Sequence, residues 1–91
     1  MDLNDKYEKL REGLNQLGNW PGVHMFKFII TADNKKIALL ISKFSAEAVI
    51  TQKESVNGKY ISITVREVMI DADSIIDRYK ELETIEGVIS L

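Results

Sequence analysis

The sequence predicts an α+β fold, in which a four-stranded antiparallel sheet carries two helices on one face and a third helix precedes the first strand. Three observations lead to this prediction. Apolar residues recur at helical spacing in three segments, and they alternate with polar residues in segments typical of strands. An Asn57-Gly58 pair, the strongest short hairpin signal in the chain, joins two of those strands. With 91 residues, the chain has room for one core.

The first predicted helix runs from Asp5 to Leu17. Its apolar residues recur at steps of three and four and form one stripe: Leu3, Tyr7, Leu10, Leu14 and Leu17. Gly18 and Pro21 end the helix, because glycine favours the position after a helix and proline cannot continue one. A helix this short does not persist alone in water, so we expect its stripe to pack against another part of the protein.

The first predicted strand, Val23–Thr31, has apolar residues on both faces, which is typical of a central strand. The helix that follows, Asn34–Phe44, is capped by Thr31 or Asp33, since both side chains can accept hydrogen bonds from the free N–H groups of a first turn. Its apolar stripe consists of Ile37, Leu40, Ile41 and Phe44.

The second predicted strand, Ala46–Val56, becomes polar in its second half, as an edge strand does to avoid pairing with foreign strands. After the turn, Tyr60–Val68 forms the third strand. Apolar and polar residues alternate cleanly there until Glu67, so one face belongs to the core and the other is wet or covered by something polar.

The last predicted helix, Asp71–Glu83, begins at a capping residue, either Asp71 or Asp73. Gly87 ends it, and Val88–Leu91 forms a short final strand. The inner stripe of this helix consists of Ile75, Ile76, Tyr79 and Leu82.

From the first strand onwards the elements follow the order strand–helix–strand–strand–helix–strand, which is the split βαβ or ferredoxin-like arrangement. Right-handed crossovers place both inner helices on one face, with the strands in the order fourth, first, third, second. The other face is open unless the N-terminal helix, another subunit or a ligand covers it, and we expect the helix to be the cover. Its side chains are expected to be Met25, Lys27, Ile29, Tyr60, Ser62, Thr64 and Arg66.

Twelve basic and fourteen acidic residues give a net charge of −2 at pH 7. This balance argues against a dedicated nucleic-acid binder and against a polybasic membrane anchor. The polar N-terminus is unlike a signal peptide. The longest nearly apolar stretch, Met25–Ala32, is interrupted by Lys27 and is too short to span a membrane. We therefore expect a cytoplasmic protein that binds neither nucleic acid nor membrane.

The chain contains no cysteine, and His24 is its only histidine. One histidine without cysteine builds neither a familiar catalytic triad nor a transition-metal site, so we interpret His24 as a surface or sheet-rim residue. Asp71, Asp73 and Asp77 could act as paired carboxylates. At the start of a helix, however, they are better interpreted as residues that cap it and complement its dipole. We expect no enzymatic activity, no metal and no cofactor.

The loop Ser55–Tyr60 lacks the glycine spacing of a phosphate loop and joins two strands, so we interpret it first as a hairpin turn. Lys59 and Tyr60 at its mouth are binding candidates, because exposed loop ends often carry sites. An RNA-binding sheet of this topology exposes aromatic residues on its middle strands, whereas here only Tyr60 remains outside. The candidate binding surface consists of Lys27, Lys59, Tyr60, Ser62 and Arg66.

Four short motifs stand in this order: Trp20-Pro21 before the first strand, Phe26-Lys27 within it, Ser55 to Tyr60 with Ser62, and Tyr79 with Leu82. In these motifs residues 20–91 resemble the YbeD-like family of small bacterial proteins of unknown function, and residues 1–19 are an amphipathic extension. The resemblance implies one ferredoxin-like domain, similar to the ACT-type regulatory domains that bind amino acids or other small effectors at strand edges and subunit interfaces. It implies no catalytic residue.

We therefore expect a non-catalytic regulatory or adaptor domain that binds a small effector or a partner protein. The alternative is a structural module that forms a homodimer through strands or sheet faces and has no small-molecule ligand. The weak edge strand and the partly apolar open face favour that alternative.

Overall fold

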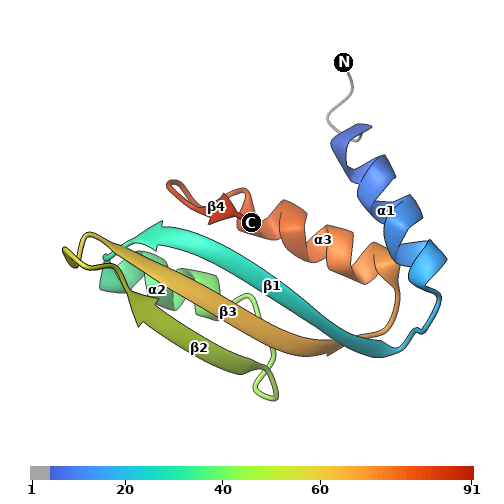
Figure 1. The fold of residues 1–91 in the computed structure, drawn as a ribbon, viewed down its shortest axis with the longest axis horizontal. Helices are drawn as coiled ribbons and strands as arrows, with labels where there is room; N and C mark the ends of the chain where they lie inside the picture. Colours follow the sequence, from blue (N-terminus) through green and yellow to red (C-terminus); the bar gives the residue numbers. More distant parts are fainter. Residues whose placement is uncertain (1–4) are drawn as a thin grey trace.

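The structure, a computed structural model, describes residues 5–91 and consists of one twisted sheet with helices packed against it (Figure 1). The strands are β1 (Gly22–Thr31), β2 (Val49–Glu54), β3 (Tyr60–Met69) and β4 (Ile89–Ser90), and the helices are α1 (Asp5–Leu17), α2 (Asn34–Ile41) and α3 (Ala72–Leu82). All paired strands are antiparallel, in the order β2-β3-β1-β4. Read from the β4 edge, this is the expected order fourth, first, third, second. The predicted α+β class and four-stranded antiparallel sheet are confirmed.

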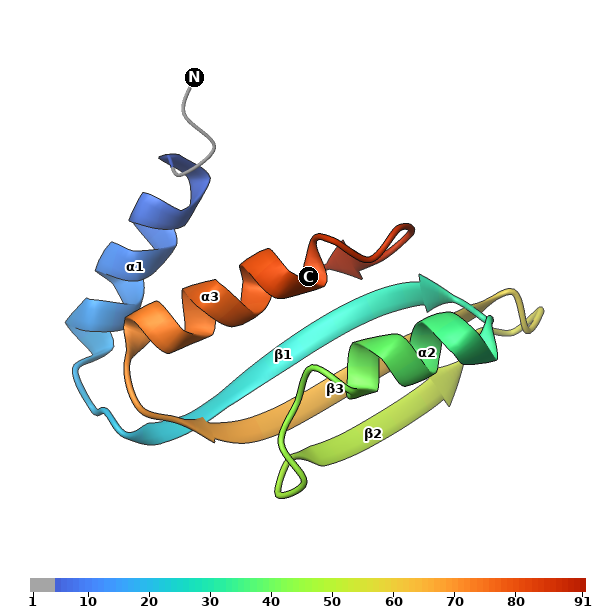
Figure 2. The ribbon, with the colours of Figure 1, turned by 180° about the vertical axis from the view of Figure 1, so that it is seen from behind.

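The core lies between one face of the sheet and the helices α2 and α3. In register, Phe26 is opposite Val65 and Phe28 is opposite Ile63, and all four side chains are fully buried. Figure 2 shows α2 in front of the sheet, on the side that Figure 1 hides, and α3 alongside β1. Both helices and the turn after α2 add apolar residues to this one cluster: Leu40 from α2, Phe44 from the turn, and Ala72, Ile75 and Leu82 from α3.

Each inner helix has one cap, and the structure selects between the two predicted candidates. Asp33 caps α2, because its carboxylate accepts the backbone N–H of Lys35 at 2.9 Å. Asp71 caps α3 and forms a reciprocal capping box with Ser74, whose N–H donates to the Asp71 carboxylate at 2.8 Å. These side chains replace hydrogen bonds that the first turn of a helix lacks, and they set where both helices begin.

Several helices and strands are shorter than predicted. The helix α2 ends at Ile41, three residues before Phe44, because Lys43 and Phe44 donate to carbonyls only three residues back and tighten the chain. The strand β2 loses its first three and last two predicted residues. A turn that begins at Ser45 precedes it, and the hairpin turn that begins at Ser55 follows it. The final strand is reduced to its two residues Ile89 and Ser90.

The expectation that the N-terminal helix covers the open face is wrong. The helix α1 packs against α3 instead, where the Arg11 guanidinium lies 2.7 Å from the Asp73 carboxylate and Tyr7 bonds to Glu83. Leu14 joins the core cluster, and the Trp20 indole donates to the Leu14 carbonyl at 3.1 Å. The packing partner of the stripe is therefore another helix, except at its last predicted member, Leu17, which is exposed. Its predicted first member, Leu3, lies outside the described residues.

Candidate binding site on the open face of the sheet

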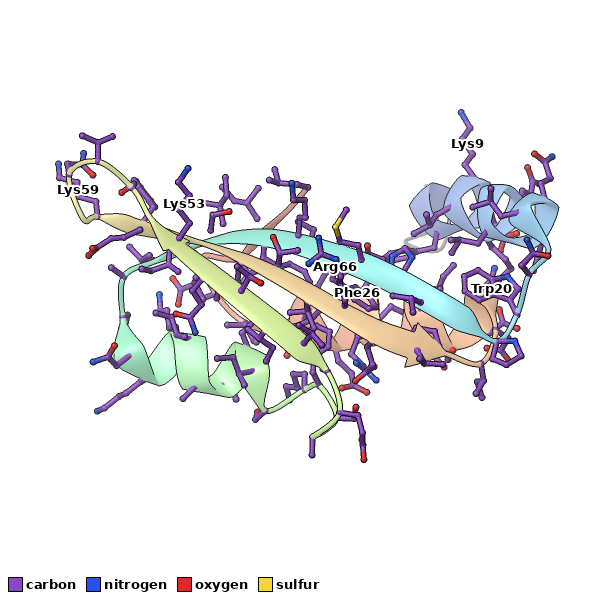
Figure 3. The ribbon with its side chains drawn as sticks, turned by 60° about the horizontal axis from the view of Figure 1, so that its bottom comes forward. Lys9, Trp20, Phe26, Lys53, Lys59 and Arg66 are labelled. Carbon is purple, nitrogen blue, oxygen red and sulfur yellow. The ribbon has the colours of Figure 1, made fainter. Side chains whose placement is uncertain are left out.

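The open face is the side of the sheet that carries no helix. Strand register places side chains of β1 and β3 beside one another there, with Met25 opposite Arg66 and Lys27 opposite Thr64. Pairing of β2 with β3 adds Lys53, opposite Ser62. In Figure 3, Lys53 and Arg66 project from the same side of the sheet, and Lys59 stands at the tip of the hairpin. The face is thus a single surface built from residues that are far apart in the sequence.

Large apolar side chains are exposed on this face. Val23 is 66% exposed, Val49 is 60% exposed and Val68 is 65% exposed. Further members are Met25, Tyr60 and Ile89. Single exposed apolar residues are ordinary, but a contiguous group of them is typical of an interaction surface.

The charged side chains at the outward positions of the strands all have one sign. Lys27, Lys53 and Arg66 are exposed, and none of them forms an ion pair with another residue of the described part of the chain. No aspartate or glutamate occupies an outward position on this face in any of the four strands. Because the whole chain has a net charge of −2, the acidic excess lies elsewhere. The face is therefore a cationic and apolar surface on an acidic protein.

Two shallow hollows lie at opposite ends of the open face. The hairpin hollow, of about 430 Å³, is formed by Ile29, Val56 and Tyr60, with Lys53 and Ser62 beside them. Glu54 also borders it, but its carboxylate lies next to Gly58, at the turn itself.

The loop hollow, of about 500 Å³, lies where β2 begins. Its apolar wall consists of Val23, Val49 and Val68, and Arg66 provides its cation. Glu47 from the loop before β2 stands at its rim, as does Glu67. Each hollow therefore has an apolar wall and one cation, with glutamate at its border.

Four of the five predicted binding residues lie on this face: Lys27, Tyr60, Ser62 and Arg66. Lys59 does not. Its N–H donates to the Asn57 side chain at 3.1 Å and its carbonyl accepts from Ala32, which fixes it in the hairpin turn. Sequence reasoning missed Lys53. Lys53 lies two residues after Thr51, so the sequence places both on one face of this strand, but which face it is follows only from the register with β3.

A separate polar cluster lies on the helix side. The Glu67 carboxylate accepts from the Ser45 N–H at 2.6 Å and from the Arg78 guanidinium at 2.7 Å. Burial by itself raises the pKa of Glu67, but these two donors outweigh it and hold the pKa below its usual value. Alternation in β3 therefore continues through Glu67, an inward residue that a cation neutralises. The cluster fastens the loop after α2 to α3.

His24 lies on the same side, at the rim of the sheet. Its Nε2 is 3.2 Å from the Tyr79 hydroxyl, and its ring contacts Phe26 edge-on. Burial lowers the pKa of His24, which favours the neutral ring. Among the described residues, no group of three or more acidic or histidine side chains could hold a metal ion. In this arrangement His24 packs as a partly buried rim residue, turned away from the open face.

Comparison with known proteins places the chain in a family. The family described as "Protein of unknown function (DUF493)" matches residues 15–91. The chain belongs to the DUF493 family. The YbeD-like resemblance is consistent with that assignment. No curated protein and no solved structure matches the chain.

The DUF493 match begins inside α1 and includes the whole sheet together with α2 and α3. All residues of the open face are therefore within the segment that defines the family membership. No helix in residues 5–91 of this DUF493 chain has both the length and the apolar character needed to cross a membrane.

Proposed function

We propose that this DUF493 protein is a non-catalytic regulatory or adaptor domain that acts by binding a protein partner through the open face of its sheet. The observation that supports this most directly is the face itself, which remains uncovered although α1 was available to cover it. A monomeric protein exposes large contiguous apolar patches mainly where something binds. The apolar residues and unpaired cations of this face fit that role.

A binding role also agrees with the contacts of the side chains that could take part in acid–base chemistry. His24 is turned towards Tyr79, and the Glu67 carboxylate is occupied by Ser45 and Arg78. His24 does not face the open side of the sheet, and the Glu67 carboxylate, which borders the loop hollow, is already paired with Arg78, so the surface that we propose for binding has no unoccupied acid–base pair on it. We therefore propose a domain without enzymatic activity.

The strand order and the YbeD-like resemblance support a ferredoxin-like domain of the ACT type. A small effector is thus the second candidate ligand, and the hairpin hollow supports it. Its volume of about 430 Å³ falls within the usual range of small-molecule pockets. Tyr60, Ser62 and Lys53 would provide the polar contacts, which suits a compact carboxylate with an apolar portion.

A nucleic acid is a poor candidate for this surface. Among the described residues, Tyr60 is the one aromatic residue at an outward position of the strands, and base stacking needs such residues. A face-to-face homodimer is also disfavoured. It would bring two copies of Lys27, Lys53 and Arg66 together without any acidic residue of the face between them.

Photo-crosslinking tests the proposed function. A photoreactive amino acid is placed in the full chain at Thr64, in the middle of the open face, or at Lys35, exposed on α2 behind the sheet. We expect an adduct with another protein from Thr64 and none from Lys35. For the effector version, we expect a metabolite to raise the melting temperature of the wild-type protein but not that of Tyr60→Ala. The absence of both results would refute a binding role for this face.

A further inference from the structure

The two hollows set the length of what can occupy both of them. Along β3, the hairpin hollow includes Tyr60 and Ser62, and the loop hollow includes Arg66 and Val68. Their middles are therefore separated by about six residues of strand, or about 20 Å at about 3.4 Å per residue. A single occupant that fills both hollows must be at least this long.

The backbone of the occupant is also constrained. The open face presents side chains, and the strand backbones behind them already bond to each other. An extended segment laid on this face would have its own N–H and C=O groups without partners, which is costly. A helix satisfies those groups internally, and at about 1.5 Å per residue it covers about 20 Å with about fourteen residues, or four turns.

The charges of the open face constrain the amino-acid composition of the occupant. In register, Lys53 on β2 lies level with Ser62 and Lys27 on β1 lies level with Thr64, while Arg66 lies on β3 between these two strands. The three cations therefore form a triangle that extends from the hairpin hollow to the loop hollow. Each is exposed and has no ion-pair partner in the described chain. A helix that lies between the two hollows would have Lys53 on one side and Lys27 on the other, so acidic residues on both borders of its apolar stripe could pair with the three cations.

We propose that the partner of the open face is an acidic amphipathic helix of about four turns from another protein. This inference rests on the proposed function and names its partner class. The helix α1 of the same chain is not this occupant, because its apolar stripe packs on α3. A second copy of the open face is not the occupant either, because it carries the same positive charges.

The test identifies the bound segment and then measures its charge dependence. The adduct formed at Thr64 is digested, and the crosslinked segment of the partner is read by mass spectrometry. That segment is synthesised as a labelled peptide, and its dissociation constant is measured by fluorescence anisotropy. We expect a segment with apolar residues at helical spacing and an excess of aspartate and glutamate, which gains helical circular dichroism when it binds.

Charge-reversal variants provide the second readout. We expect Lys27→Glu, Lys53→Glu and Arg66→Glu each to weaken binding of the peptide about three- to tenfold, and added salt to weaken binding to the wild type. Lys35→Glu reverses an exposed charge behind the sheet and is expected to change the affinity less than about twofold. Circular dichroism and the melting temperature confirm that every variant is folded.

The outcomes separate this inference from the proposed function. A crosslinked segment that is basic, neutral or extended would overturn the acidic helix and retain the binding role of the face. Dissociation constants that do not change in the three charge-reversal variants would do the same. An adduct with a second copy of this chain would replace the helix with a homodimer. No adduct at Thr64, together with no metabolite that raises the melting temperature, would overturn both proposals.

Discussion

The two faces of the sheet are built from the same strands and differ almost completely in their surroundings. Along β1, Phe26 is 0% exposed, whereas its neighbour Met25 is 46% exposed. Each face has large apolar residues, so the presence of apolar side chains does not distinguish the two faces. What separates them is which face the helices cover. This comparison shows that the helix face holds the core of the fold, whereas the open face remains exposed.

The largest expected effect compares adjacent residues on the two faces. Phe26→Ala removes a ring that contacts Phe28, Phe44 and Tyr79, and it should lower the free energy of unfolding by about 3–5 kcal/mol. Met25→Ala should lower it by about 1 kcal/mol or less, because its side chain is half in water. Urea denaturation measures both. Equal losses would show that the open face is also part of the core.

A second comparison tests whether α1 belongs to the helix layer. Leu14 is 5% exposed and packs in the core cluster, so Leu14→Ala is expected to cost about 2–4 kcal/mol. Leu17 on the same helix is 71% exposed, and Leu17→Ala is expected to change stability by less than about 0.5 kcal/mol. If both substitutions prove harmless in thermal or urea unfolding, α1 is an appendage and contributes nothing to the core.

The buried ion pair provides a third, smaller effect with a defined pH dependence. Glu67→Gln leaves the Arg78 charge without its partner and should cost about 1–3 kcal/mol at pH 7. Because the pKa of Glu67 is lowered by folding, its contribution is present above the pKa of unfolded glutamate and disappears as pH falls through the folded value. The stabilities of wild type and Glu67→Gln should therefore converge in acid. Glu81→Gln, at an exposed position, is the control.

The smallest effect concerns His24. Folding lowers its pKa through burial, so the unfolded chain takes up this proton at a higher pH than the folded protein does. The protein should therefore lose stability as pH falls from about 7 to 5. His24→Gln should flatten that part of a melting-temperature profile. An unchanged slope in this variant would assign the pH dependence to other groups.

Some features were predictable because their cause is local. The alternation in β1 and β3 assigned four of the five candidate binding residues to one face, since side chains of a strand alternate by geometry alone. The capping aspartates were also predictable, because an N-cap bonds within three residues of itself. The ends of β2 were not, because a strand ends where its partner stops pairing with it.

The amino-acid sequence by itself therefore determined which helices and strands form and which side chains of the two central strands share a face. It also determined that no acidic residue is among the expected open-face side chains. Only the tertiary structure decided that α1 docks on α3, that Lys53 joins Lys27 and Arg66, and that Glu67 is neutralised by Arg78. The physical reason is range. Periodicity and capping act over a few residues, whereas docking depends on the competition between apolar surfaces far apart in the sequence, and burial of the stripe of α1 against α3 left the open face uncovered.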